Sequence, residues 1–284
     1  MYDKPQDTVL TGYHVLDLTD EKGELAVRLL SDMGAGITRL NLENREERAG
    51  LPKLVKKADV LIETFPPGYL ASLSLGYSSL VKVNPRLIMV SITHFGQTGP
   101  YKNYKSSDLI DQALGGWLSV TGEAETPLKL FGNQSYNTAS LFAVNGILLA
   151  LRQRHTAGRG QYLDISIMDC VVATLDHVLP RYFYEGIVSK RRGSRHWNNA
   201  FDILPCRDGY ILLSVHQNWD TLVEWLVSEG MAADLTSEKW RDREKRNRNI
   251  EHVLKVLKKW TLSHSVGELE EKGQLMHFPW AEVK

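Results

Sequence analysis

Strands that are apolar on both faces are the feature that most constrains the fold of this chain. The runs at 14–19, 59–65 and 87–93 (HVLDLT, DVLIETF and LIMVSIT) are dominated by apolar residues and do not alternate cleanly with polar ones. Such strands are typical of parallel sheets, because the helical crossovers of a parallel sheet cover both of its faces. We therefore predict an α/β fold built on a parallel sheet.

Segments of helical period separate these strands, as that fold requires. The stretch from Glu24 places Leu25, Leu29 and Met33 on one face and reaches a glycine stop at Gly34. Further helices are predicted at 51–58, 69–83 and 137–154, and further strands at 37–42 and 162–167. The order of the elements therefore predicts successive strand–helix–strand units.

The character of the sequence changes after Pro180, where a stretch follows that is aromatic and basic and has little periodicity. Beyond it come a hairpin that turns at 207–209 and helical segments at 218–229, 238–247 and 249–262. We predict a large domain over 1–177, a linker over 178–197 and a smaller α+β domain over 198–284.

Charge and cysteine content exclude several classes of function. The 34 basic residues balance the 34 acidic ones, so no overall field favours nucleic acid or an anionic membrane. Cys170 and Cys206 are far apart and match no metal or redox spacing, which favours a reduced compartment. The first residues lack the pattern of a signal peptide, and no apolar run is long enough to span a bilayer. We expect a cytoplasmic protein without a metal, nucleic-acid or membrane partner.

The stretch FGQTGPYKNYKSSDLIDQALGGWLSVTG, residues 95–122, has two interpretations. Gly96 and Gly99 suit a tight turn, and the backbone N–H groups of such a loop can also line a ligand pocket. Asp108 precedes an amphipathic segment, where it could cap the helix LIDQAL with Asp111 in the first turn. The stretch is therefore either a solvated turn before a capped helix or part of a ligand site.

The ordered set of motifs resembles the family III CoA-transferases, of the CaiB/BaiF type. The motifs are VLDLT, LLSDMGAGITR, ADVLIETFPPGYLASLSLGYSSL, NPRLIMVSITHFGQTGPY, SDLIDQALGGWLSVTG, GILLALRQRHTAGRGQYLDISIMD and FPWAEV. They cover nearly the whole chain in collinear order. The resemblance implies a Rossmann-like large domain, a smaller α+β domain and two chains that interlock as a dimer.

The resemblance also implies chemistry on coenzyme A. In such enzymes an aspartate attacks an acyl-CoA, and CoA passes through an enzyme-bound thioester to a small carboxylic acid. Counting back from Gly146 and Gly158, the aspartate's position holds Tyr136 here. A phenol with a reference pKa of about 10 cannot form the anhydride, so the nucleophile is replaced. Asp108, which matches a supporting acid of the family, is the carboxylate left in this neighbourhood.

Two related expectations concern the shape of the family site. Racemases of this fold use a histidine at the position of Ser107, so a racemase is set aside. Relative to the family it resembles, the chain lacks a segment between GAGITR and LNLEN that helps to hold the CoA nucleotide, and it ends at FPWAEVK. We expect a shortened member with weakened CoA binding.

CoA-binding residues follow from the same resemblance. Thr64 and Phe65 stand at a strand's carboxyl end, where open α/β sheets bind ligands. Gly96 and Gly99 belong to the glycine loop, and Lys105 aligns with a lysine that contacts CoA.

Two functions remain open at this point. The chain is either a CoA-transferase acting on acyl-CoA and a carboxylic acid, or a silent CoA-binding subunit whose partner bears the aspartate. An aromatic surface predicts a homodimer or a heteromer with such a paralogue; its residues are Tyr182, Phe183, Tyr184 and Trp197.

Overall fold

The chain divides into two compact units, seen in a computed structural model that describes residues 8–284. The first unit runs to Val120 and resumes over Leu128–Val188, and the second comprises Thr121–Pro127 and Ser189–Lys284. The short segment 121–127 joins the second unit because the carbonyl oxygen of Gly122 accepts a hydrogen bond from the Gly193 N–H, at 3.0 Å. The predicted boundaries placed that segment in the large domain, 1–177.

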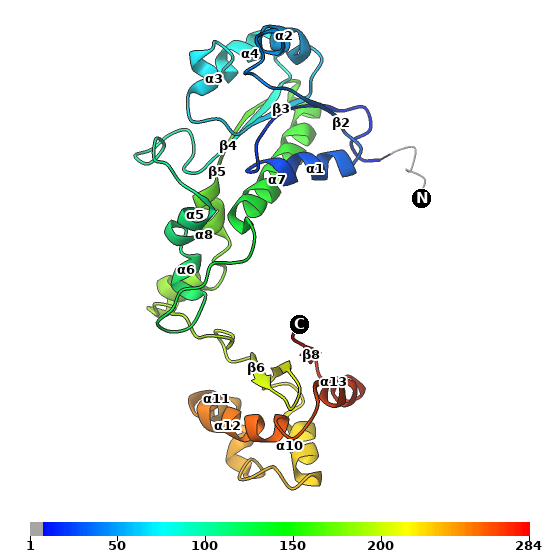
Figure 1. Cartoon of the computed structure of the whole chain (residues 1–284), viewed down its shortest axis with the longest axis vertical. Coiled ribbons are helices and arrows are strands. Elements are labelled where there is room, and N and C mark those ends of the chain that lie inside the picture. Colours follow the sequence, from blue (N-terminus) through cyan, green and yellow to red (C-terminus); the bar gives the residue numbers. More distant parts are fainter. Residues whose placement is uncertain (1–7) are drawn as a thin grey trace. The chain divides into compact units, whose positions relative to one another are not determined.

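A five-stranded parallel sheet forms the centre of the first unit, which confirms the predicted α/β fold (Figure 1). Its strand order is β2-β1-β3-β4-β5. The strands are β1 (His14–Leu18), β2 (Gly36–Arg39), β3 (Val60–Glu63), β4 (Ile88–Thr93) and β5 (Tyr162–Ser166). The apolar runs at 59–65 and 87–93 contain β3 and β4, which are neighbours in the sheet.

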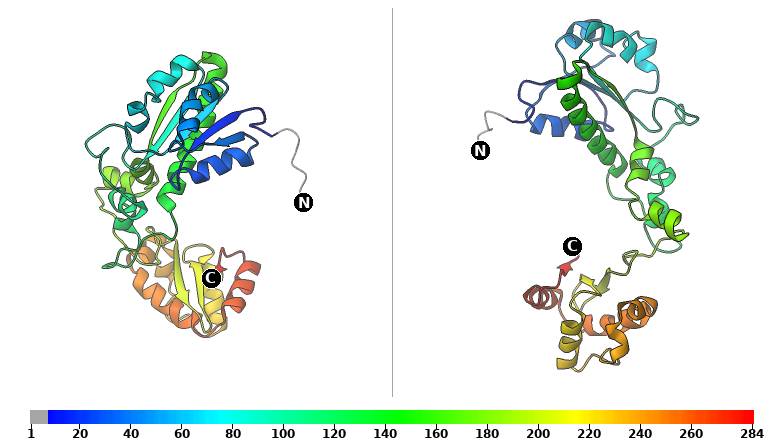
Figure 2. Two further views of the ribbon diagram at one scale, coloured as in Figure 1. Left: turned by 45° about the horizontal axis from the view of Figure 1, so that its top comes forward. Right: turned by 180° about the vertical axis from the view of Figure 1, so that it is seen from behind.

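Helices cover both faces of this sheet (Figures 1 and 2). Val15 faces α1 (Glu24–Asp32) and α7 (Gln134–Ala157), whereas its neighbour Leu16 belongs to the apolar cluster on the other face. That cluster includes residues of α2 (Arg45–Val55), α3 (Tyr69–Ser72) and α4 (Tyr77–Val83). The strands are apolar on both faces because each face packs against a helical layer.

Local hydrogen bonding and backbone strain set helix boundaries that periodicity alone missed. Helix α2 begins earlier than the predicted segment 51–58, because the Asn44 side chain accepts hydrogen bonds from the N–H groups of Glu46 and Glu47. The helix predicted at 69–83 is two helices, since Ser74 between them adopts a φ of 61°. A left-handed residue cannot continue an α-helix.

The first unit has further helices, two between the glycine loop and α7 and the others after β5. They are α5 (Asp108–Leu114), α6 (Trp117–Val120), α8 (Ile167–Ala173), α9 (Val178–Pro180) and a π-helical turn at Arg181–Glu185.

The second unit is a small α+β domain with its own core. A hairpin of β6 (Phe201–Pro205) and β7 (Tyr210–Ser214) forms as predicted, and β8 (Ala281–Glu282) adds to it. The helices are α10 (Trp219–Ser228), a 3-10 turn at Glu238–Arg241, α11 (Arg243–Arg248), α12 (Ile250–Thr261) and α13 (Val266–Leu275). The Glu229 carboxylate accepts hydrogen bonds from the indoles of Trp225 and Trp260, at 2.8 and 2.7 Å. Those bonds satisfy two buried donors of the aromatic core.

Gly160, in the turn before β5, allows the chain to approach β4 closely. Its N–H donates to the Pro85 carbonyl oxygen at 2.8 Å, and a Cβ at this position would lie 1.9 Å from the Leu87 carbonyl oxygen. Backbone atoms cannot move aside as a flexible side chain can, so only glycine fits here.

We expect Gly160→Ala to lower the free energy of unfolding by about 3 kcal/mol or more, at the upper end of overpacking costs. The matched control is Gly50→Ala in α2, where nothing lies within 4 Å of the new methyl group. That control should stabilise the helix by about 0.5–1 kcal/mol. Denaturant unfolding of both variants measures the difference, and equal stabilities would contradict the close approach.

Candidate active site

A cavity of about 880 Å³ opens at the carboxyl edge of the parallel sheet. Its walls come from the segments that follow β1, β2, β3 and β4, and from the loop at 102–106. The strand order reverses between β1 and β3, and open α/β sheets bind ligands at such a reversal. The residues that line the cavity are Leu18, Thr19, Asp20, Lys22, those at 39–42, those at 64–67, Thr93, His94 and those at 102–106.

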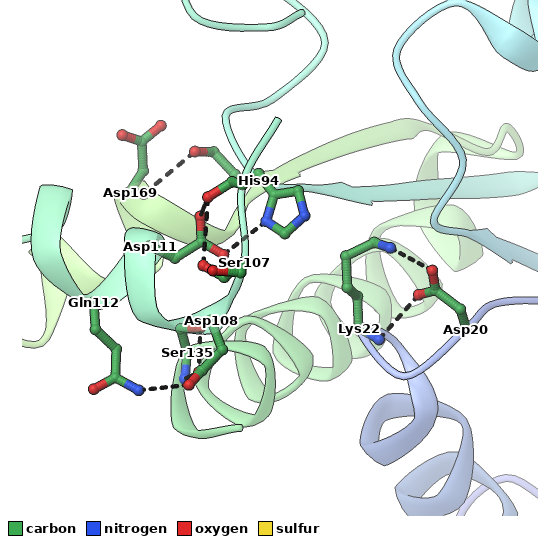
Figure 3. Close-up of polar contacts among 11 residues, drawn as sticks. Asp20, Lys22, His94, Ser107, Asp108, Asp111, Gln112, Ser135 and Asp169 are labelled. Atoms are coloured by element: carbon green, nitrogen blue, oxygen red, sulfur yellow. Dashed lines mark hydrogen bonds and ion pairs between the residues drawn. The ribbon is translucent and has the colours of Figure 1, made fainter. Parts of the chain in front are cut away.

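Positive charge dominates this cavity. Lys22, Arg39, Lys102 and Lys105 line it, with Asp20 as the acidic residue among the lining side chains. The Asp20 carboxylate pairs with the Lys22 ammonium group (Figure 3). The Asp20 N–H donates to the Thr64 hydroxyl at 2.9 Å. An excess of cations suits a ligand that carries phosphate or carboxylate groups.

His94 follows directly after β4 and is paired with a buried acid (Figure 3). Its Nδ1 lies 2.7 Å from Asp111 Oδ2, and the Ser106 hydroxyl donates to Asp111 Oδ1 at 2.6 Å. Asp111 is completely buried. Because a carboxylate accepts and does not donate, Nδ1 carries a proton, and in the neutral imidazole Nε2 then presents its lone pair.

Asp108 is not among the residues that line the cavity, and it is held by several donors. Its carboxylate accepts hydrogen bonds from the Ser135 N–H and hydroxyl, at 3.0 and 2.7 Å, and from the Gln112 amide at 2.8 Å. The Lys129 ammonium group lies 2.6 Å away. Burial alone would raise the pKa of Asp108, but these donors outweigh it and hold the pKa below its ordinary value. The helix cap is Ser107, so the interpretation of Asp108 as a cap is wrong.

Tyr136 stands in the first turn of α7 and is 5% exposed. Its ring centroid is 5.9 Å from that of His94. Burial, together with the nearby charge of Asp111, raises the pKa of Tyr136 to about 12. The phenol therefore stays protonated at neutral pH and is a weak nucleophile.

The predicted binding residues fall into two separate cavities of the first unit. Thr64, Phe65 and Lys105 line the cavity described above. Gly96 and Gly99 line a second one of about 560 Å³, which also includes Asp164. Both glycines have positive φ, and the next N–H, that of Gln97, donates to the Asp164 carboxylate at 2.9 Å. Their part in binding remains a prediction.

Sequence analysis missed His94, its pairing with Asp111, and the cations Lys22 and Arg39. His94 and Arg39 stand at or just beyond the carboxyl ends of strands, which is where such residues can be sought in any α/β sequence. The pairing had no sequence signature, because Asp111 also reads as an ordinary charge in a first helical turn.

Neither cysteine supplies an alternative nucleophile. Burial raises the pKa of the Cys170 thiol to about 12 and that of Cys206 to about 11, so both thiols are protonated at neutral pH. Across residues 8–284, no three His, Cys, Asp or Glu side chains gather where they could hold a metal ion. Nor does any helix within those residues have the length and apolar character to cross a membrane.

Comparison with known proteins decides the family. The sequence profile described as CoA-transferase family III matches residues 37–284. The chain belongs to CoA-transferase family III. A crystal structure of a CaiB/BaiF family protein from Brucella suis has the same fold, with a TM-score of 0.87 and 25% identity over 98% of this chain and 85% of that one.

Curated relatives of this family III chain are CoA-transferases. The succinyl-CoA:(R)-benzylsuccinate CoA-transferase subunit BbsE of Thauera aromatica is 32% identical over 83% of this chain and 59% of its own. The acetyl-CoA:oxalate CoA-transferase of Acetobacter aceti is 32% identical over 82% of this chain and 62% of its own. The chain therefore spans about three fifths of the length of these relatives.

Glu63, the last residue of β3, is a buried acid that directly precedes Thr64 of the cavity lining. It is 4% exposed, and its carboxylate accepts a hydrogen bond from the Phe65 N–H at 2.7 Å. Burial raises the pKa of Glu63 from 4.5 to about 7, because the Ser91 and Phe65 hydrogen bonds do not offset the lost hydration.

We expect Glu63→Gln to stabilise the protein relative to wild type more at pH 8 than at pH 4.5. In wild type the unfolded chain releases this proton near pH 4.5 and the folded chain only near pH 7, so stability falls as the pH rises between those values. The shift corresponds to about 3 kcal/mol at full effect. Denaturant unfolding at both pH values measures it, with Glu43→Gln at an exposed position as the control. An equal effect of Glu63→Gln at the two pH values would contradict the raised pKa.

Proposed function

We propose that this protein binds an acyl-CoA and transfers CoA between carboxylic acids. Membership of CoA-transferase family III and the curated relatives support this reaction class. The substrates would be an acyl-CoA thioester and a small carboxylic acid, and a cytoplasmic setting would suit the two free, buried thiols.

The cationic cavity at the carboxyl edge of the sheet is the observation that carries the proposal. Its volume of about 880 Å³ falls within the range of about 300–1,000 Å³ usual for ligand and cofactor sites. Lys102 and Lys105 are exposed and suit the phosphates of CoA, while Thr93 and His94 suit the thioester end. Thr64 and Phe65 would form the wall between these ends.

The transfer itself needs a carboxylate that can carry the acyl group. A carboxylate oxygen adds to the thioester carbonyl and releases CoA as its thiolate, which then attacks the enzyme's own carbonyl and frees the donor acid. Asp108 remains the candidate on this chain. It can act only if Lys129 and Gln112 release its Oδ2, or if Ser135 releases its Oδ1. Tyr136 would stay protonated beside the reacting groups.

A second candidate is a CoA-binding subunit whose partner provides the aspartate. It would account for the protonated phenol of Tyr136, because a phenol cannot form the anhydride. One relative is itself named as a subunit. Tyr182, Phe183 and Tyr184 are 56%, 75% and 90% exposed, which suits contact with a second copy or with such a paralogue.

We expect the Lys105→Glu variant to bind CoA at least about tenfold more weakly than wild type at low salt, a loss of about 1.4 kcal/mol. Reversing a charge that faces the ligand's phosphates adds repulsion to the lost attraction. Calorimetry measures the affinity, and Lys82→Glu on α4, outside the cavity lining, is the control. Equal losses in both variants, or no heat from wild type at millimolar CoA, would contradict the site.

We expect the isolated chain to transfer CoA slowly and Tyr136→Asp to raise that rate by at least about a hundredfold, since each power of ten needs about 1.4 kcal/mol of barrier. The control is Tyr136→Asn, which has nearly the same size as the aspartate variant but no carboxylate. Hydroxylamine trapping with peptide mass spectrometry should place a hydroxamate at position 136 in the aspartate variant alone.

Two other results would change the assignment of the nucleophile. Transfer by wild type that disappears in Asp108→Asn, with a hydroxamate on Asp108, would make Asp108 the nucleophile. Equal rates in Tyr136→Asp and Tyr136→Asn would show that position 136 is not where a carboxylate works. If transfer appears only with an aspartate-bearing paralogue, sedimentation should show the two chains moving together.

A further inference from the structure

His94 is the group in the cavity that the transfer chemistry does not use. Its imidazole lines the cavity, and its side chain is 21% exposed. No hydrogen bond to its Nε2 occurs among the described residues, whereas its Nδ1 is bound to the buried Asp111. Figure 3 shows the second ring nitrogen facing the side of the site on which Lys22 and Asp20 lie.

We propose that His94 is a general base that activates water to hydrolyse the acyl-CoA thioester, with Asp111 as its positioning residue. This activity goes beyond CoA transfer, but it rests on the proposed binding of acyl-CoA in the same cavity. The ligand is a CoA thioester, and the co-reactant is water.

His94 is held through both its side chain and its backbone. Asp111 fixes its tautomer, and the Ser106 hydroxyl holds the other carboxylate oxygen at 2.6 Å. On the backbone side, the His94 carbonyl oxygen accepts the N–H of Met168 at 3.0 Å. A base that is fixed in one tautomer and orientation needs little reorganisation when it takes a proton.

Thr93 provides a second, independent observation. Its side chain lines the cavity and is 4% exposed, and within the described residues its hydroxyl has no hydrogen-bond partner. A buried hydroxyl without a partner is costly, so its retention beside His94 favours a ligand or a water molecule as the missing partner. The hydroxyl can hold the attacking water or the thioester carbonyl.

The reaction is balanced without any enzyme nucleophile. His94 Nε2 takes a proton from water while the hydroxide oxygen bonds to the thioester carbonyl carbon. The tetrahedral intermediate then collapses with cleavage of the C–S bond, and the imidazolium returns the proton to the CoA sulfur. A carboxylic acid and free CoA result. The Tyr136 phenol stays protonated and does not capture the acyl group. At that position, therefore, no carboxylate competes with water for the thioester carbonyl.

Thiol release from acetyl-CoA, succinyl-CoA and benzoyl-CoA, without an acceptor acid, tests this activity on the full chain. We expect His94→Ala to lower kcat by about 10²–10⁴-fold, the usual contribution of a general base. The calorimetric affinity for the acyl-CoA should change far less than kcat, whereas the melting temperature should fall because the buried Asp111 loses a partner. Added imidazole should restore part of the rate, which a purely structural role for His94 would not allow. Asp111→Asn should lower kcat and leave KM nearly unchanged.

A matched control keeps the test specific to the cavity. His14 is also a partly buried histidine of the same sheet, hydrogen-bonded to Thr38, but it stands at the amino end of β1. His14→Gln should retain wild-type thiol release.

Three results would overturn the inference. The first is acyl-CoA that binds to wild type without releasing thiol, and the second is full thiol release by His94→Ala. The third is hydrogen exchange at the α-carbon in D₂O without thiol release, since it would make His94 a base for a carbon acid. If no acyl-CoA binds, the proposed CoA-transferase function itself is wrong. If acyl-CoA binds but no thiol is released, only the proposed hydrolysis is wrong, so the two outcomes are distinguishable.

Discussion

All five strands of the first unit run in the same direction, and the site depends on this constraint more than on any other. In a parallel sheet every strand ends at the same edge, so the residues that follow each strand meet there. Lys22, Arg39, Phe65 and His94 come from four different segments and share one cavity for this reason. The helices that cover both faces bury the central strands β1, β3 and β4.

Burial acts on the acids of the first unit with opposite results, and hydrogen-bond donors decide between them. Asp108 faces Lys129, Gln112 and two donors of Ser135, so its pKa is lowered despite burial. Glu63 has fewer donors, and burial raises its pKa to about 7. Burial also raises the pKa of Tyr136, because it disfavours the charged form of the phenol. The position where the family resemblance expects an ionised carboxylate therefore holds a neutral phenol.

The sheet could be predicted from sequence because its strands are buried on both faces and leave an unmistakable apolar pattern at 59–65 and 87–93. Helix boundaries were harder to predict. The start of α2 depends on one side-chain cap at Asn44, and the break at Ser74 depends on a positive φ that no periodicity encodes.

The site was predictable only in part, for a similar reason. The cavity is lined by three of the predicted binding residues, Thr64, Phe65 and Lys105. Their place could be predicted because strand ends and loops can be placed from topology. His94 and Asp111 are 17 positions apart in the sequence and meet through a tertiary contact between the end of β4 and α5. No local sequence pattern indicates this contact. Gly96 and Gly99 line another cavity, and no local sequence pattern indicates which way their loop turns.

A crystal structure with a thioether analogue of acetyl-CoA, which cannot be hydrolysed, tests the central claim most directly. The claim is that acyl-CoA binds in the cationic cavity with its acyl end beside His94. The account predicts the phosphates against Lys102 and Lys105, and the acyl carbonyl in contact with His94 Nε2 or the Thr93 hydroxyl. An analogue bound in the second cavity, or one whose acyl group lies away from His94, would contradict it.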